Sequence, residues 1–273
     1  AKGKEAAAAI ELMPRRNGSR AALLKPTGLQ TRLLVPDNPL MPSYDFTIEA
    51  YIVLNSVDEG ATMRTLLSRW DGRKDQPGWS LGVTGLKATG KPQSLSLELI
   101  GDPAEDGNGG YDVISSGLRV ELDTPYYLAV SLRIGDTSET GLTFFLKELT
   151  AGAPLVTARM AHKVTANHQS NLPLIIGARE PDKAVVWDGL VDDIRLSKAA
   201  LKPDQLLVNR EGTNEDTIGY WLFEDPNFFK DNSPHGHSIR SDIAPTSTLT
   251  AQAAALTDFC HLLFNTNEFL YLD

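Results

Sequence analysis

The sequence predicts an all-β protein, a sandwich of short strands joined by turns. Apolar side chains alternate along residues 45–54, from Phe46 to Leu54, and a period of two indicates a half-buried strand. Similar short runs recur about every 8 to 15 residues, the spacing typical of sandwiches. The 22 glycines and 16 prolines are spread through the chain rather than clustered, which suits many strands separated by turns.

The expected elements begin with a lead-in segment, residues 1–19. Residues 1–16 are rich in Ala, Glu and Lys, and they favour one short helix. The sandwich itself is expected to span residues 20–240, without an internal repeat. Its strands are expected at residues 21–25, 30–36, 45–54, 65–69, 79–84, 94–100, 111–115, 126–134, 141–147, 155–160, 172–177 and 188–196.

Residues 241–273 are interpreted as a linker and a short C-terminal helix. Leu256, Phe259, Cys260 and Leu263 recur there at helical spacing, which is typical of an amphipathic helix. Such a helix would pack on the sandwich or on a neighbouring domain. The chain starts without Met, so we expect it to be part of a longer protein.

Charge and composition limit the classes of partner that this protein is expected to bind. The formal net charge is −9 and the basic residues form no cluster, which argues against nucleic acid and against anionic membrane surfaces. No apolar run approaches the roughly 20 residues of a membrane span, so membrane insertion is not expected. Neutral glycans, cations or a basic protein are compatible with this charge. Cys260 is the one cysteine, and an internal disulfide is therefore excluded.

Residues 187–206 read WDGLVDDIRLSKAALKPDQL. This stretch resembles the closing strand of laminin-G-like domains, whose pattern is G-x-I-D-(D/E)-V-R-(I/V), followed later by A-L. Residues 45–52 and 125–131 resemble two further strands of that family. The resemblance implies a concanavalin-A-like jelly-roll sandwich of two antiparallel sheets. It says little about activity, because this fold hosts many functions.

Residues 219–224 and 230–236 resemble the segment that normally opens such domains, yet here it comes late. One hypothesis is a permuted sandwich, in which residues 217–238 supply the opening strand. The alternative is an extra C-terminal strand that pairs elsewhere.

The tail, residues 253–273, resembles the ending of a domain in large planctomycete cytochrome-c-like multidomain proteins, which carry laminin-G-like inserts nearby. This likeness implies other domains in a parent chain and an extracytoplasmic location, periplasmic or at the cell surface. Cys260 and His261 lack the second cysteine of a C-x-x-C-H motif, so no haem is expected within this chain.

Jelly-roll domains often bind carbohydrate at loops on the rim. Trp70 and Trp187 are expected at strand ends, where loops would display them, whereas Trp79 and Trp221 lie inside strand patterns and are expected in the core. An exposed indole offers a sugar a flat apolar face and one donor. The alternative is that Trp70 and Trp187 cap the core. The candidate ligand-binding residues are Trp70, Asp71, Arg73, Trp187 and Asp188.

The family resemblance also implies a structural Ca²⁺ where the opening segment meets the closing strand. Carried over to this sequence, Asp192 is the first candidate ligand and Asp231 the second. Asp192 shares a strand face with Ile194, so its carboxylate would be shielded and need a partner. A cation would supply one, and a salt bridge is the alternative. Residues 102–112 contain a second cluster of acidic side chains. Their spacing differs from that of a calcium loop, and the segment is interpreted as a solvated hairpin loop.

Two stretches match catalytic patterns only in part. Residues 78–82 match G-x-S-x-G, but a turn follows where a nucleophile elbow needs a helix. Glu121 and Asp123 lack the second glutamate of a retaining glycosidase pair. The sequence therefore predicts a non-catalytic module that binds carbohydrate or protein. A purely structural assembly module is the first alternative, and a glycoside hydrolase is the second.

Overall fold

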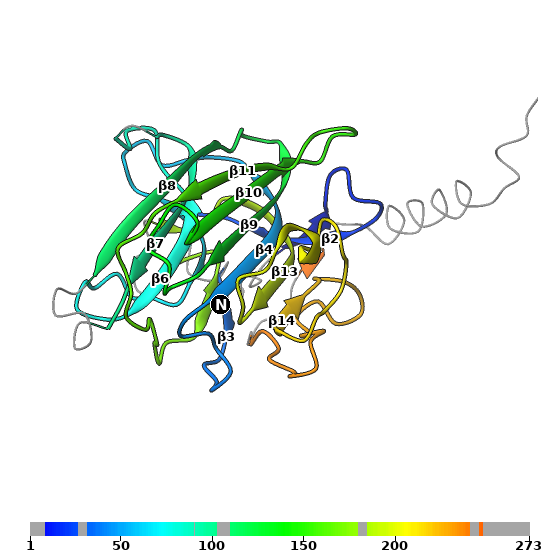
Figure 1. Ribbon diagram of the computed structural model, residues 1–273. Helices are drawn as coiled ribbons and strands as arrows, with labels where there is room; N and C mark the ends of the chain where they lie inside the picture. Colours follow the sequence, from blue (N-terminus) through cyan, green and yellow to red (C-terminus); the bar gives the residue numbers. More distant parts are fainter. Residues whose placement is uncertain are drawn as a thin grey trace, which may run out of the picture.

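The computed structural model describes residues 9–26, 32–89, 91–102, 110–179, 185–240 and 246–247. These residues form two sheets packed face to face (Figure 1). Apart from Val185, helical structure among them is limited to one 3-10 turn, η3 (Pro203–Gln205). The predicted all-β sandwich is confirmed, while the predicted C-terminal helix lies outside the described residues. No helix in the described part is long and apolar enough to span a membrane.

Sheet A has nine strands, in the order β11-β10-β9-β4-β13-β2-β1-β15, with β14 also paired to β13. All its neighbours are antiparallel except β1 and β15. The strands are β1 (Ala9–Leu12), β2 (Arg20–Leu24), β4 (Phe46–Leu54), β9 (Pro125–Leu132), β10 (Leu142–Glu148), β11 (Val156–Met160), β13 (Gly189–Ser197), β14 (Thr217–Trp221) and β15 (Thr246–Ser247).

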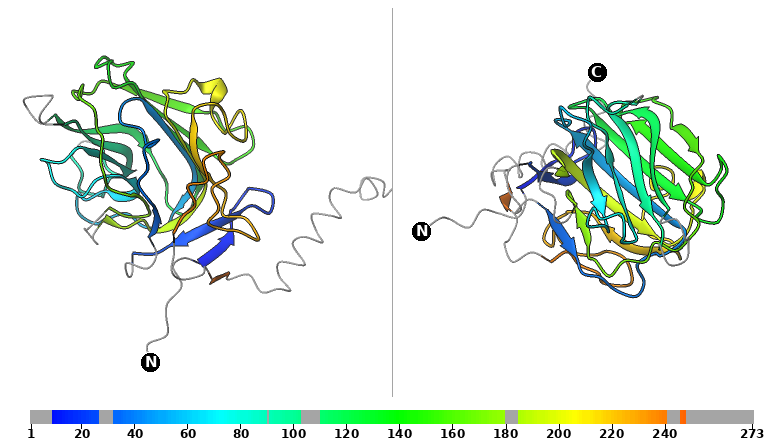
Figure 2. Two further views of the ribbon diagram at one scale, coloured as in Figure 1. Left: turned by 90° about the horizontal axis from the view of Figure 1, so that it is seen from below. Right: turned by 90° about the vertical axis from the view of Figure 1, so that its left-hand side faces the viewer.

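Sheet B has six strands, in the order β3-β12-β5-β6-β7-β8, and every pair is antiparallel. Figure 2 shows β6, β7 and β8 side by side in its right-hand view. The strands are β3 (Leu33–Val35), β5 (Arg64–Ser68), β6 (Gly78–Val83), β7 (Ser94–Ile100), β8 (Tyr111–Arg119) and β12 (Leu174–Ile176).

The core lies between the two sheets and follows the predicted alternation. Phe46, Ile48 and Ile52 of β4 point into it, and Phe46 packs on Trp79 of β6 with ring centroids 5.3 Å apart. Trp79 and Trp221 are both fully buried, as predicted. Each large apolar side chain placed there stabilises the fold by about 1.5–3 kcal/mol.

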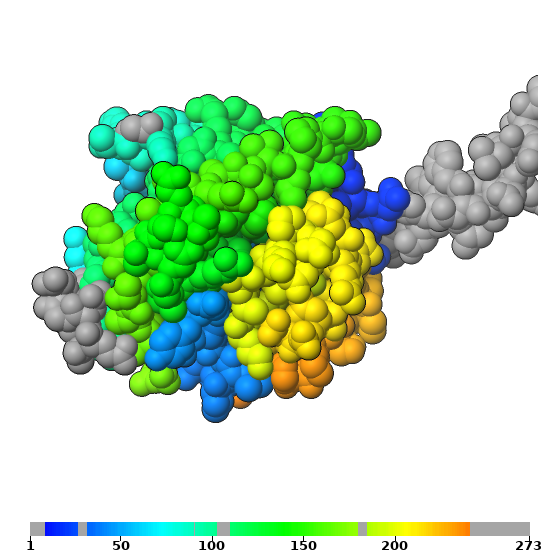
Figure 3. All heavy atoms as spheres, in the orientation of Figure 1, coloured from blue at the N-terminus to red at the C-terminus, as the bar shows by residue number. Residues whose placement is uncertain are grey.

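The outer face of sheet A is also apolar, and the chain covers it. Tyr51, Tyr127 and Phe145 project from the face opposite to the core and pack against Leu201 and Leu206. These two leucines belong to residues 198–216, the segment that follows β13. In the space-filling view this segment forms a continuous yellow surface beside the green surface of β9–β11 (Figure 3).

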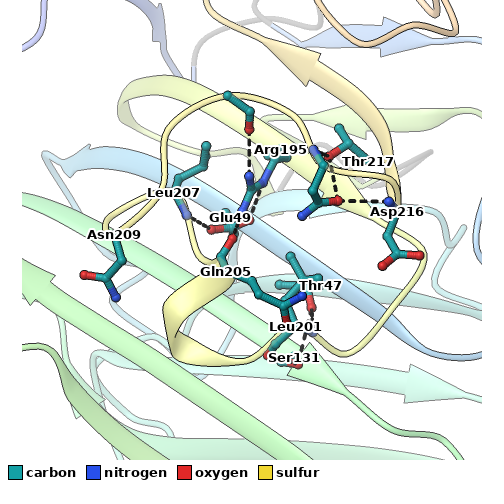
Figure 4. A network of polar contacts seen from close by, with 12 residues as sticks. Thr47, Glu49, Ser131, Arg195, Leu201, Gln205, Leu207, Asn209, Asp216 and Thr217 are labelled. Atoms are coloured by element: carbon teal, nitrogen blue, oxygen red, sulfur yellow. Dashed lines mark hydrogen bonds and ion pairs between the residues drawn. The ribbon is translucent and has the colours of Figure 1, made fainter.

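A buried ion pair fixes this covering segment (Figure 4). Arg195 of β13 donates from Nε to Oε2 of Glu49, at 2.6 Å, and its other nitrogens donate to the backbone oxygens of Gly212 and Gln205, each at 2.7 Å. Glu49 Oε1 accepts from the Leu207 amide at 2.6 Å. Backbone groups of residues 198–216 complete the hydrogen bonds of this pair. If the segment moved away from sheet A, both charged side chains would lose these partners, so the pair holds the segment in place.

The N-terminal part corrects one prediction. Residues 1–16 were expected to favour a helix, but Ala9–Leu12 form strand β1, which pairs with β2 in a hairpin (Figure 2, dark blue). An isolated helix of this length is only marginally stable in water. Pairing with β2 gives these residues stable backbone hydrogen bonds instead. Both β2 and β14 pair with β13, at Gly189–Val191 and at Ile194–Ser197 respectively. The permutation hypothesis and the predicted domain boundaries stay predictions.

Candidate functional site

The outer face of sheet B is polar along β6 and β7, whereas a small apolar cluster with Leu34 and Ile175 lies over β3 and β12. Along β7, Leu95, Leu97 and Leu99 point into the core, so Ser96 and Glu98 point outward. Ser80 of β6 and Val113 of β8 lie opposite Glu98 on its two sides. The small neighbours leave Glu98 as the longest side chain of this row, one strand in from the edge strand β8.

Glu98 is held by an arginine from another part of the chain. Arg179 follows β12, and its Nη1 donates to Glu98 Oε2 at 2.8 Å. Both side chains are 14% exposed, so water reaches the pair only partly. Tyr111 at the start of β8 donates from its hydroxyl to Glu98 Oε1 at 3.3 Å. The carboxylate thus has a partner on each oxygen.

Aromatic rings surround this pair. The Arg179 guanidinium lies 4.9 Å from the centre of the Trp70 ring, and the rings of Trp70 and Tyr111 are 5.9 Å apart. Lys74 places its ammonium 4.5 Å from the centre of the Tyr111 ring. We refer to Trp70, Lys74, Glu98, Tyr111 and Arg179 as the outer-face cluster.

The electrostatics follow from partial burial. Burial raises the pKa of Glu98, and the charge of Arg179 opposes that shift. Burial, followed by the neighbouring Glu98 carboxylate, raises the pKa of Tyr111 to about 12. At neutral pH Tyr111 therefore keeps its proton and remains a donor. The cluster presents cations, a carboxylate and the partly exposed Tyr111 ring, groups of the kinds that bind sugar hydroxyls and sugar rings.

A groove of 980 Å³ adjoins the cluster. Val113 and Ser115 of β8 contribute to it, together with Lys91, His162 and Lys163. Val113 is 49% exposed and sits directly opposite Glu98 in the β7–β8 ladder. An extended ligand lying in the groove would therefore pass beside the cluster.

Three of the predicted ligand-binding residues lie at this place. Trp70 belongs to the cluster, but it is only 3% exposed, because Arg179 and Tyr111 cover it, so the prediction that a loop displays its ring is wrong. Asp71 and Arg73 form an ion pair at 2.6 Å in the same turn, and the Trp70 indole donates to the Arg73 carbonyl at 2.8 Å. Gly72 has a φ of 87° there, a conformation that glycine adopts without strain.

Trp187 and Asp188 lie elsewhere. Trp187 is fully buried and packs in the core cluster between the sheets, which contradicts its expected display on a loop. Asp188 accepts a hydrogen bond from the hydroxyl of Ser56. The structure therefore does not bring these two residues together with Trp70.

Asp192 is buried and bound by protein groups. Arg16, in the turn between β1 and β2, forms ion pairs with Asp192 and with Asp193, the latter at 2.6 Å. Ser19 donates from its hydroxyl to the same Asp192 carboxylate at 2.9 Å. The guanidinium of Arg16 occupies the position expected for a cation, which is the salt-bridge alternative foreseen for this residue.

Asp231 is also satisfied. Its Oδ1 accepts from the amides of Tyr220 and Ser233, both at 2.8 Å, and its Oδ2 accepts from the Ser233 hydroxyl at 2.7 Å and the His237 amide at 2.6 Å. Calcium binds six to eight oxygen ligands. Neither this carboxylate nor that of Asp192 has an oxygen left open for it. Among the described residues, no group of three or more His, Cys, Asp or Glu side chains could hold a metal. The residues present do not fit the implied calcium site.

Sequence reasoning missed four members of the cluster, Lys74, Glu98, Tyr111 and Arg179. A signal existed for Glu98, because the alternation of residues 94–100 places it on the polar face with two serines. Arg179 had none, since it lies 81 residues from Glu98 in the chain. The G-x-S-x-G match, residues 78–82, lies within strand β6. This strand lacks the turn and helix of a nucleophile elbow.

Comparison with protein families identifies the fold family. A model described as the concanavalin A-like lectin/glucanases superfamily, of the laminin-G type, matches residues 27–207. The chain belongs to this superfamily. No curated protein matches the sequence.

Solved structures show the same fold at low sequence identity. The enzymatically active domain of bacteriophage CBA120 tailspike protein 2 is 14% identical, with a TM-score of 0.56, over 79% of this chain and 31% of that one. A Bacteroides ovatus protein to which carbohydrate binding is ascribed is 13% identical, with a TM-score of 0.52, over 82% of this chain and 58% of that one. The chain thus spans about a third of the tailspike, and this likeness concerns the fold alone.

Proposed function

We propose that this domain is a non-catalytic recognition module that binds carbohydrate at the outer-face cluster. The observation that carries the proposal is the Glu98–Arg179 pair, held among Trp70, Tyr111 and Lys74 beside the groove along β8. Sugar hydroxyls both donate and accept, so they suit a carboxylate and a guanidinium placed side by side. The superfamily contains lectins, and a structural neighbour has carbohydrate binding ascribed to it.

A catalytic role has less support. Glycoside hydrolysis ordinarily needs two carboxylates, about 5–5.5 Å apart for retention and about 6.5–9.5 Å for inversion. Glu98 is the one carboxylate of the cluster as the structure describes it, and Arg179 and Tyr111 occupy its oxygens. The superfamily also includes glucanases, and the tailspike domain is enzymatic, so hydrolysis is the outcome to test against binding.

An assembly module is the second candidate, favoured by one observation. Trp70 and Trp187 are both buried, which is what a purely structural sandwich would require of them. In either case we propose an extracytoplasmic domain of a larger protein. The resemblance of the tail to planctomycete cytochrome-like proteins stays a prediction, and that tail lies outside the described residues.

The deciding experiment is a glycan-array and polysaccharide-affinity screen, run with calcium and again with chelator. The wild type should bind at least one glycan saturably. Arg179→Gln should weaken that binding by about tenfold or more, because a charge-assisted hydrogen bond contributes about 1.5–3 kcal/mol. The melting temperature of each variant shows whether it is folded.

Arg119→Gln is the matched control, because Arg119 pairs with Glu121 at 2.7 Å on the exposed end of β8, away from Trp70. It should leave binding unchanged. Absence of binding to every glycan would favour the assembly module, and release of reducing ends would establish a hydrolase instead.

A further inference from the structure

A second, smaller pocket opens on the outer face of sheet A. It has a volume of 290 Å³. Its floor follows one row across three strands, since Thr143 of β10 lies opposite Ser131 of β9 on one side and Arg159 of β11 on the other. Thr157, one row away, also lines it. The pocket lies on the opposite sheet from the outer-face cluster.

The wall of the pocket is fixed in place. It consists of residues 200–203, the start of the segment that covers sheet A (Figure 4). Ser131 donates to the Leu201 carbonyl at 3.2 Å, and the Leu201 amide donates to Thr47 at 2.8 Å. Thr47 in turn donates to the Ala199 carbonyl at 2.7 Å. The backbone of the wall is therefore already in place for a ligand, whereas Arg133, Arg159 and Lys202 are exposed side chains.

The lining is cationic. Arg133, Arg159 and Lys202 contribute to it, and none of its described residues is an acid. Over the described part of the chain these three side chains form no ion pair within 4.0 Å, although the protein has 35 acidic residues and 26 basic ones. Asp136, the acid nearest Arg133 in sequence, accepts hydrogen bonds from Ser138 and Thr140, and its contact with Arg133 is limited to an electrostatic attraction without an ion pair.

The hydroxyl groups add donors. Within the described structure, the hydroxyls of Thr143 and Thr157 make no hydrogen bond, so both can donate to a ligand. A guanidinium carries five N–H donors and an ammonium three, and neither accepts. A lining this rich in donors matches a group with three or four oxygen acceptors better than a carboxylate with two.

We propose that this pocket binds an oxyanion, the sulfate or phosphate ester group of an acidic ligand. Arg159 and Arg133 would clamp the oxygens, Lys202 would close the site from the wall, and Thr143 and Thr157 would donate from the floor. The site is separate from the outer-face cluster, so the inference does not depend on the proposed carbohydrate function.

The test is a titration of the folded protein with sodium sulfate and with phosphate, followed by NMR or calorimetry, at ionic strength held constant with sodium chloride. Saturable binding is expected. Arg159→Ala and Lys202→Ala should each weaken it about tenfold, the loss expected for one charge-assisted hydrogen bond. Arg210→Ala is the matched control, an exposed arginine outside the pocket, and should change nothing.

Polymers then test whether the pocket accepts an ester-bound anion, and the ratio of the sulfated to the phosphorylated polymer's affinity distinguishes the two sources. Dextran sulfate and a phosphorylated mannan should compete with sulfate, whereas neutral dextran should not. A linear response that chloride reproduces, or an equal loss with Arg210→Ala, would overturn the proposal, because either result describes general screening. Arg179→Gln should leave sulfate binding intact, so failure of the carbohydrate proposal would be visible separately.

Discussion

The two sheets of this sandwich turn opposite kinds of face away from the core. Sheet A presents Tyr51, Tyr127 and Phe145, and the chain covers them with its own residues 198–216. Sheet B turns Ser80, Ser96 and Glu98 outward from β6 and β7, and its smaller apolar cluster, around Ile175, lies over β12. The covered face serves stability, whereas the polar part of sheet B carries the cluster proposed for recognition.

A glutamate–arginine pair lies on each of these faces, and the two pairs differ in burial. Glu49 and Arg195 are at most 1% exposed and are completed by backbone groups. Glu98 and Arg179 are 14% exposed and are bordered by aromatic rings. The same two residue types therefore fix a segment on one face and present donors and acceptors on the other.

The largest effect is expected from Glu49→Gln compared with Glu98→Gln. The first change leaves Arg195 buried without its countercharge and should cost about 3–5 kcal/mol. The second leaves Arg179 within reach of water and should cost about 1 kcal/mol. Urea unfolding of both variants measures the difference. Equal losses would show that both faces are equally structural.

The sequence allowed the sandwich to be predicted, because alternation on β4 and β7 reports which side chains reach the core. It could not give the burial of Trp70, since the residues that cover it, Arg179 and Tyr111, come from distant parts of the chain. Likewise, Arg16 lies 176 residues from Asp192, and no local pattern links them. Local periodicity predicts strand faces, whereas a site depends on which strands and loops become neighbours.

The core between the faces contains a pH-sensitive group. His168 packs against Phe46 at 5.2 Å and contacts the Tyr44 carbonyl at 2.6 Å. Burial lowers the pKa of His168 to about 4, while an unfolded histidine titrates near 6.5. The unfolded chain therefore binds the extra proton between these values, and stability should fall by about 3 kcal/mol as pH drops from 6.5 to 4.

Chemical unfolding at several pH values measures this dependence, and His168→Phe should remove that share of the slope. A variant with the wild-type slope would show that other groups dominate acid unfolding.

The Arg16 ion pairs with β13 test the expectation of a structural calcium ion. Arg16→Gln removes the cation that neutralises Asp192 and Asp193 and should cost about 2 kcal/mol, between the values for exposed and buried pairs. The wild type should melt at the same temperature with calcium or with chelator, because Arg16 already occupies the cation position. A calcium-dependent rise would be easily detected, since a ligand at a hundred times its Kd adds about 2.7 kcal/mol.

The smallest effects compare one serine from each face. Ser131 on sheet A donates to the Leu201 carbonyl of the covering segment, so Ser131→Ala should cost about 1 kcal/mol. Ser80 on sheet B is buried, and its hydroxyl has no hydrogen-bond partner among the described residues. Ser80→Ala should therefore leave the free energy of unfolding nearly unchanged. A stability loss equal to that of Ser131→Ala would contradict this expectation and would mean that the Ser80 hydroxyl is also structural.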